Sequence, residues 1–184
     1  SRMTVEEKVR LLHANGGYRS WGVPRLGIPD NNPTDGPVGL RPEMEWSNWN
    51  NAHANNDSCT AFPSMICLAA TWNQEMGVLF GKAYSEEALY RNKNIILGPG
   101  VNIFRTPMNG RNFEYMGEDP YLASKMGVSY IQGVQSNHVA ACVKHFAVNN
   151  QEINRYSINT LVDERTLHEI YLPAFKAAVQ DGKV

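Results

Sequence analysis

Two clusters of polar residues in this sequence each follow a short apolar run. Lys144 and His145 come directly after the run 139–143, and the polar segment 102–111 follows the run 95–97. If the two apolar runs are parallel strands, both clusters lie beyond their carboxyl ends, where α/β proteins bind ligands. The sequence therefore predicts one site that combines both clusters.

The residue types in and around these clusters suit recognition of a sugar. Charged and amide groups can make paired hydrogen bonds to neighbouring hydroxyls, and an aromatic ring can cover the C–H side of the sugar. The residues of the right kind for this task are Asp35, Arg111, Lys144, His145, Asn149 and Arg155.

Several of these residues also have a purely structural interpretation. Asp35 lies in a Thr-Asp-Gly-Pro sequence, where a carboxylate commonly caps the backbone of a turn. Arg111 could form an ion pair with Glu114 or Glu118. The polar run 149–152 could be a solvated loop cap. The residue types alone leave these alternatives open.

For Lys144 and for the tryptophans, one of the two interpretations is favoured over the other. A cationic side chain beside the core is costly without a partner, so a site role is favoured for Lys144. Trp46 and Trp72 fit a core or surface position better than a stacking platform.

Other chemistries find little support. Gly98-Pro99-Gly100 lacks a following Gly-Lys-Ser/Thr, so no phosphate-binding loop is predicted. The five histidines are scattered without metal-ligand spacing, and no Gly-x-Ser-x-Gly sequence indicates a serine hydrolase. We therefore expect neither a metal ion nor another cofactor.

Composition and charge restrict the partners. The 17 basic and 18 acidic residues leave a net charge of −1 without any Lys/Arg run, so no nucleic-acid partner is expected. No stretch approaches the ~20 apolar residues of a membrane span, and no signal peptide is visible. Three cysteines without metal spacing favour reduced thiols, which leaves the location open with a lean towards the cytoplasm.

Helix signals recur along the chain. A Thr-Val-Glu-Glu capping box predicts a helix over about 4–13. A second helix begins after an N-cap at Thr71, and the Asp-Pro pair at 119–120 begins a third. A fourth begins near Asp163 and is expected to kink at Pro173. The apolar side predicted for the second helix consists of Trp72, Met76, Leu79, Phe80 and Ala83.

Short apolar runs between the helices have the character of strands. The run 95–97 precedes a Gly-Pro-Gly turn, and 139–143 is apolar on both faces, as a parallel strand covered by helices would be. Residues 18–64 are rich in Pro, Gly, Asn and Asp and predict a long loop. Strands that alternate with helices indicate an α/β fold with a parallel sheet.

Seven motifs, in order along nearly the whole chain, resemble the N-terminal barrel domain of glycoside hydrolase family 3. They are the segments 3–9, 35–41 (DGPVGLR), 61–73, 97–107 (LGPGVNIFRTP), 110–120 (GRNFEYMGEDP), 144–155 (KHFAVNNQEINR) and 163–175. The resemblance implies a partial (β/α)₈ TIM-barrel-like domain, roughly its first half, over residues 1–184. A complete barrel has about 250 residues, so the chain is expected to be an incomplete domain.

The resemblance also implies which residues bind substrate. Asp35, Arg111, Lys144, His145 and Arg155 would hold the nonreducing sugar of a β-glucoside or oligosaccharide in the −1 subsite. The KHFAVNNQE run lacks the Gly-His-Gly sequence typical of the family's β-N-acetylglucosaminidases, and the DGPxGLR form favours a β-glucosidase over a β-xylosidase.

The residues expected to do the chemistry lie elsewhere. The resemblance places the nucleophilic Asp, in a Ser-Asp-Trp-like segment, and the acid/base Glu beyond Val184. The chain by itself is therefore expected to be nearly inactive, as part of an enzyme that hydrolyses terminal nonreducing β-D-glucosyl residues with retention. The alternatives are a noncatalytic carbohydrate-binding or scaffold module, β-xylosidase-type activity, and a second polypeptide that supplies the remainder of the enzyme.

Overall fold

The fold is α/β, as the alternating helix and strand signals predict. The computed structural model describes residues 2–16, 19–41 and 58–184. Its helices are α1 (Val5–Arg10), α2 (Met65–Ala69), α3 (Gln74–Tyr90), α4 (Pro120–Gln135), α5 (Glu164–Thr166) and α6 (Pro173–Gln180), with a π-helical segment at Leu167–Tyr171 and 3-10 turns at Pro24–Leu26, Pro107–Asn109 and Asn112–Glu114. No helix in this described part is long and apolar enough to cross a membrane.

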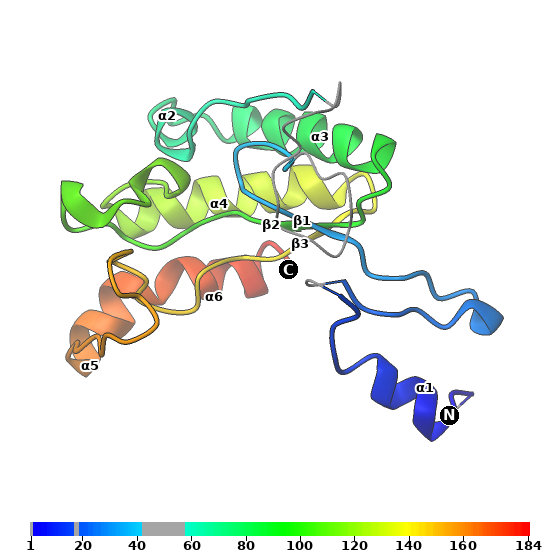
Figure 1. Cartoon of the computed structure of the whole chain (residues 1–184). Coiled ribbons are helices and arrows are strands. Elements are labelled where there is room, and N and C mark those ends of the chain that lie inside the picture. Colours follow the sequence, from blue (N-terminus) through cyan, green and yellow to red (C-terminus); the bar gives the residue numbers. More distant parts are fainter. Residues whose placement is uncertain (1, 17–18, 42–57) are drawn as a thin grey trace.

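Three parallel strands, in the order β1-β2-β3, form the sheet (Figure 1). They are β1 (Pro33–Asp35), β2 (Ile95–Leu97) and β3 (Ala140–Ala141). Because the strands run in the same direction, their carboxyl ends meet at one edge of the sheet. Parallel strands joined through helices are the repeating units of a TIM barrel, so the described residues form part of such a barrel.

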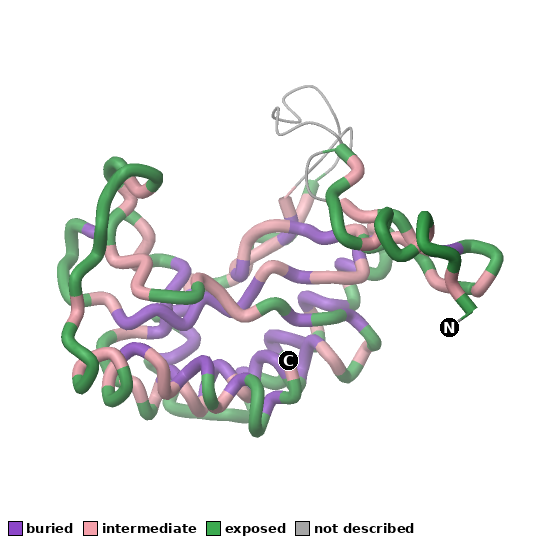
Figure 2. The backbone as a smooth tube through the Cα atoms, turned by 90° about the horizontal axis from the view of Figure 1, so that it is seen from below, coloured by how far each residue is buried: buried purple, intermediate pink, exposed green. Residues whose placement is uncertain are grey.

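Helices α3, α4 and α6 lie on one side of the sheet, and the core lies between the two layers (Figures 1 and 2). The rings of Tyr84 on α3 and Tyr130 on α4 are fully buried there, with centroids 6.5 Å apart. Their hydroxyls donate hydrogen bonds to the carbonyls of Gly36, at 2.6 Å, and Pro37, at 3.2 Å. The two tyrosines thus tie the loop that follows β1 to the helical layer.

Glycines allow α3 and α4 to approach closely. A Cβ atom on Gly81 would lie 2.3 Å from the carbonyl oxygen of Tyr130, and one on Gly133 would lie 2.2 Å from that of Val78. Both contacts are with backbone atoms, which cannot move aside without shifting a helix. The packing of these two helices therefore depends on the absence of side chains at these positions.

We expect Gly81→Ala to lower the free energy of unfolding by about 1–3 kcal/mol, because the overpacked methyl group outweighs the better helix propensity of alanine. Urea unfolding followed by circular dichroism measures the change. Gly127→Ala on α4 is the matched control, since its Cβ would meet side-chain atoms alone: a methyl group of Val101 at 3.2 Å and the sulfur of Met116 at 3.9 Å. Equal stability of the two variants would contradict this account of the interface.

The structure confirms most of the predicted elements but shortens them. The Thr4 capping box is present, with reciprocal bonds to Glu7, yet α1 ends at Arg10 rather than near 13. Asp119 caps α4, as predicted, by accepting two backbone hydrogen bonds. Asp163 caps α5, and α6 begins at Pro173. The predicted strand over 95–97 has the same bounds as β2.

Two predicted burial patterns are wrong at some of their positions. The N-cap of α3 is Asn73 rather than Thr71, and Trp72 lies outside the helix with a φ of 54° and 72% of its surface exposed. Met76 and Leu79 on α3 are also exposed, whereas Phe80 from the same predicted side is buried, together with the small residues Gly77 and Gly81. The run 139–143 is not buried on both faces: within the described residues, Val139 and Ala141 are buried whereas Ala140 and Cys142 are exposed.

The long loop predicted over 18–64 contains strand β1, which the sequence patterns did not indicate. Helix α2, which was not predicted either, begins directly after this segment at Met65, and Ser64 caps it by accepting a hydrogen bond from the backbone N–H of Cys67. Asp35 is therefore the last residue of a strand, and its carboxylate also accepts from the N–H of Gly36 at 2.8 Å. Part of this segment, including Trp46, lies outside the described residues.

Candidate functional site

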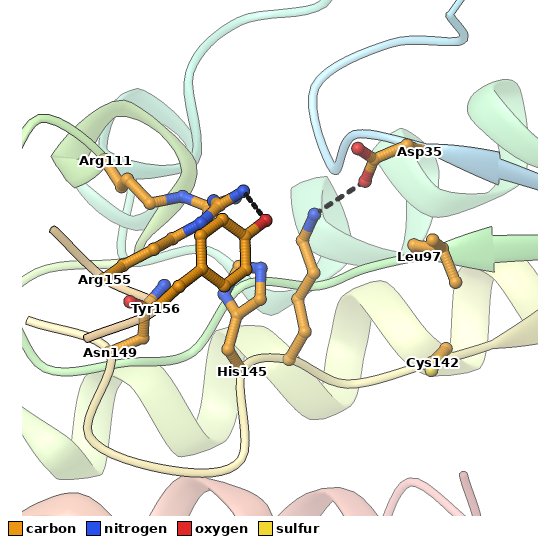
Figure 3. Close-up of a pocket in the computed structure, with 9 residues that line it drawn as sticks. Asp35, Leu97, Arg111, Cys142, His145, Asn149, Arg155 and Tyr156 are labelled. Carbon is orange, nitrogen blue, oxygen red and sulfur yellow. Dashed lines mark hydrogen bonds and ion pairs between the residues drawn. The ribbon is translucent and has the colours of Figure 1, made fainter. Parts of the chain in front are cut away.

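A pocket of about 550 Å³ lies at the carboxyl ends of the three strands (Figure 3). Its size is within the range of about 300–1,000 Å³ that is typical of small-molecule sites. Its walls combine charged, amide, apolar and aromatic side chains: Asp35, Leu97, Arg111, Cys142, Lys144, His145, Asn149, Arg155 and Tyr156. Within the described residues, no three His, Cys, Asp or Glu side chains are grouped as ligands for a metal ion.

Lys144 joins two carboxylates that come from different parts of the chain. Its Nζ atom lies 2.9 Å from Oδ1 of Asp35 and 3.3 Å from Oε2 of Glu114. The side chains of Lys144 and Glu114 are only 11% and 3% exposed, so the charges compensate one another in a largely dry environment. The core beside the strand ends thus tolerates the lysine because it has two partners.

The carboxylate of Asp35 is ionised. Burial raises the pKa of Asp35, but the charge and hydrogen bond of Lys144 and the N–H of Gly36 together hold that pKa below its usual value. About a third of the Asp35 side chain remains exposed. Asp35 therefore faces the pocket as an anion with acceptor capacity left for a ligand.

Two arginines continue the network of charges on the other side of the pocket. The Nε atom of Arg111 donates to Oε1 of Glu114, and its Nη1 atom lies 3.5 Å from Oε2 of Glu152. Arg155 donates from Nη1 to Oε1 of Glu152 at 2.9 Å. Each carboxylate of this network contacts at least one cation, so the network holds the arginine side chains in place around the pocket.

His145 is fixed through both its backbone and its ring. The side chain of Asn102 accepts from the N–H of His145 at 2.6 Å and donates to its carbonyl at 3.0 Å. The ring Nδ1 atom lies 3.1 Å from the hydroxyl of Tyr115, which also accepts from the side-chain amide of Asn149 at 2.9 Å. The opposite ring nitrogen, Nε2, remains for a ligand.

Burial, followed by the charges of Arg111 and Lys144, lowers the pKa of His145 from 6.5 to about 3. We therefore expect the His145 ring resonances in NMR spectra to stay constant between pH 8 and pH 5. Below pH 6.5 the unfolded chain binds the proton that the folded chain excludes, so His145 makes folding less favourable as the pH falls from 6.5 to 3. Titration of this ring near pH 6.5 would contradict the result, and a His145→Gln variant assigns the resonance.

The structure brings together all five residues predicted to bind a ligand. Asp35, Arg111, Lys144, His145 and Arg155 line one pocket, and so does Asn149. Their contact with a sugar remains a prediction. The Arg111–Glu114 ion pair considered from the sequence is present as well, so Arg111 has a structural partner in addition to its place in the pocket.

Other pocket residues were not identified from the sequence. Leu97 is the last residue of β2 and Cys142 directly follows β3, and their apolar character indicated only a core position. Tyr156 also lines the pocket and follows Arg155 in the sequence. Tyr115 is not a pocket-lining residue, but its hydroxyl contacts Nδ1 of His145. The signal that could have found Tyr156 is its position beside a predicted site residue.

In barrel-type α/β domains, ligands bind at the carboxyl ends of the parallel strands. The charged pocket of this chain lies at that position. Residues 52–184 match the model of the glycosyl hydrolase family 3 N-terminal domain. The chain therefore belongs to glycoside hydrolase family 3, as the motifs in the sequence indicate.

Relatives of known activity cover the full extent of the chain. Beta-glucosidase BoGH3A of Bacteroides ovatus is 62% identical over 183 residues, which are 100% of this chain and 24% of that protein. An exo-alpha-(1->6)-L-arabinopyranosidase of Bifidobacterium longum is 41% identical over 98% of this chain and 24% of that protein. The chain thus spans about a quarter of the length of these relatives.

Solved structures of the family have the same fold. β-Glucosidase 3B from Thermotoga neapolitana in complex with glucose superposes with a TM-score of 0.85 at 43% identity, over 99% of this chain and 27% of that one. This similarity confirms the α/β fold and its assignment to part of a barrel domain.

Proposed function

We propose that this chain forms the −1 subsite of a β-glucosidase and binds the nonreducing glucosyl unit of a β-glucoside. The observation that carries the proposal is the convergence of Asp35, Lys144 and His145 on one pocket at the strand ends. The high identity to BoGH3A and the glucose complex of the Thermotoga neapolitana enzyme support glucose as the sugar.

The polar groups have complementary tasks in this proposal. The Asp35 carboxylate accepts hydrogen bonds from sugar hydroxyls, while Lys144 and the arginines Arg111 and Arg155 donate to hydroxyl oxygens. Neutral His145 offers Nε2 to a further hydroxyl. Contacts distributed around the ring favour a distorted sugar, and binding energy is then available to stabilise an oxocarbenium-like transition state.

The nucleophile and the acid/base of the reaction lie on polypeptide outside this chain. Retaining hydrolysis needs two carboxyls about 5–5.5 Å apart, one of which must be free to attack the anomeric carbon. The carboxylates of Asp35, Glu114 and Glu152 are each engaged by Lys144, Arg111 or Arg155. These three carboxylates therefore bind and position rather than attack.

Hydrolysis of a panel of aryl glycosides by the enzyme that contains this chain tests the proposal. We expect the highest kcat/KM for the β-D-glucoside, lower values for the β-D-xyloside and the α-L-arabinopyranoside, and competitive inhibition by glucose. NMR of the first product should show the β-anomer, since the configuration is retained. A preference for another sugar would overturn the assignment to glucose, and release of the α-anomer would exclude retention.

A further inference from the structure

We propose that Tyr156 is an aromatic platform for the leaving group of the substrate, so that it determines which β-glucosides are hydrolysed efficiently. This inference rests on the proposed function, because it assigns the space next to the −1 subsite. The leaving groups that fit are those with an extended apolar face, namely a second pyranose ring or an aryl alcohol.

The pocket has a closed end and an open end. At the closed end the side chains of Lys144 and Arg111 are 11% and 17% exposed, and Glu114 beneath them is 3% exposed. Tyr156 lines the same pocket but is 90% exposed. In this proposal, a sugar held by the charged groups at the closed end extends its remaining substituent towards solvent, past the exposed ring of Tyr156.

The ring of Tyr156 is held by its neighbour Arg155 (Figure 3). The Nη2 atom of Arg155 donates to the Tyr156 hydroxyl at 2.6 Å, and the guanidinium carbon lies 4.7 Å from the ring centroid. Glu152 in turn accepts from Arg155 at 2.9 Å. Because Arg155 engages the hydroxyl and lies over one face of the ring, the surface that Tyr156 offers to a ligand is the other face of the aromatic ring.

An exposed aromatic ring beside a sugar site has a defined preference. Its face binds the C–H side of a pyranose or another aromatic ring, and it gains little from a small polar group. The pocket volume of about 550 Å³ leaves room beside a single hexose for such a substituent. A platform that acts only on the leaving group affects substrates according to the leaving group they carry.

Three substrates with the same sugar separate the leaving-group contact from sugar binding. β-D-Glucosyl fluoride has the same sugar as an aryl β-D-glucoside or cellobiose, but its leaving group has no apolar face. We expect Tyr156→Ala in the enzyme that contains this chain to lower kcat/KM for the aryl glucoside and cellobiose by about tenfold. The value for the fluoride should change less than twofold. Tyr156→Phe should retain most of the activity on the aryl glucoside and cellobiose.

Tyr90→Ala is the matched control, because Tyr90 at the end of α3 is 89% exposed and is not among the pocket-lining residues. It should leave all three kcat/KM values unchanged. An equal loss on the fluoride and the aryl glucoside, no loss on either, or a Tyr156→Phe variant as impaired as Tyr156→Ala overturns the platform. A wild-type enzyme that hydrolyses none of the three substrates overturns the proposed function itself.

Discussion

Asp35→Ala is expected to lower kcat/KM for an aryl β-D-glucoside by about 10³-fold, or roughly 4 kcal/mol of transition-state stabilisation. Asp35 is an ionised acceptor that faces the pocket, and hydrogen bonds to a charged group contribute about 1.5–3 kcal/mol each. Lys144 contacts two carboxylates, so without Asp35 its Nζ atom keeps the contact with Glu114. Steady-state kinetics of the enzyme that contains this chain measures the loss.

Asp30→Ala provides a closely matched control. Asp30 is 29% exposed and lies 2.8 Å from Nη2 of Arg19, whereas Asp35 is 31% exposed and lies 2.9 Å from Nζ of Lys144. Both variants thus break an ion pair of similar length and exposure, but Asp30 is not a pocket residue. A loss of activity of similar size in the two variants would show that Asp35 supports the fold rather than the sugar.

The sequence predicted where helices begin, because the signal for a helix start comes from neighbouring residues. Caps at Thr4, Asp119 and Asp163 depend on a side chain and the next few backbone N–H groups, so they can be identified from sequence. Strand β1 has no such signal. It is three residues long, begins with Pro33, and exists because it pairs with β2, 62 residues further along the chain. Pairing between distant segments cannot be read from either segment alone.

The side of α3 that packs against α4 was only partly predicted, for a related reason: Phe80 is buried beside Tyr130, but Met76 and Leu79 are exposed. Large apolar residues such as Met76 and Leu79 suggested the buried side, but a close helix contact needs small residues at the interface. Gly77 and Gly81 occupy that interface, where an added Cβ would collide with α4. A pattern based on the size of apolar residues therefore finds Phe80 but misses the glycines at such a contact.

The candidate site was more predictable than the fold that supports it. Lys144 and His145 directly follow the predicted strand 139–143 and lie just beyond the end of β3, so the geometry of parallel sheets places them at the ligand-binding edge. What the sequence could not provide is the contact between Lys144 and Glu114, which are 30 residues apart and meet only because the polypeptide after β2 returns to the strand ends. Family resemblance supplied the residue set, and the structure supplied the partners.

Within this charged network, substitution of Glu114 should affect both the stability of the fold and the affinity for glucose. We expect Glu114→Gln to lower the free energy of unfolding by about 3–5 kcal/mol, because it leaves the partly buried cations of Arg111 and Lys144 short of a counter-charge. Both cations also line the proposed sugar site, so glucose affinity should fall in the same variant. Urea unfolding and calorimetric titration with glucose measure the two effects.

The comparison with Glu87→Gln tests whether the effect comes from this network. Glu87 on α3 is 19% exposed, lies 3.6 Å from Nε of Arg91 and accepts from the backbone N–H of Thr60, yet it is not a pocket residue. Its substitution should cost less stability, because the Glu87–Arg91 ion pair is longer than the contacts of Glu114 with Arg111 and Lys144, and should leave glucose affinity unchanged. If Glu114→Gln were as stable as wild type and bound glucose equally well, Arg111 and Lys144 would not depend on Glu114. The charged network would then be a consequence of the fold rather than the support of the site.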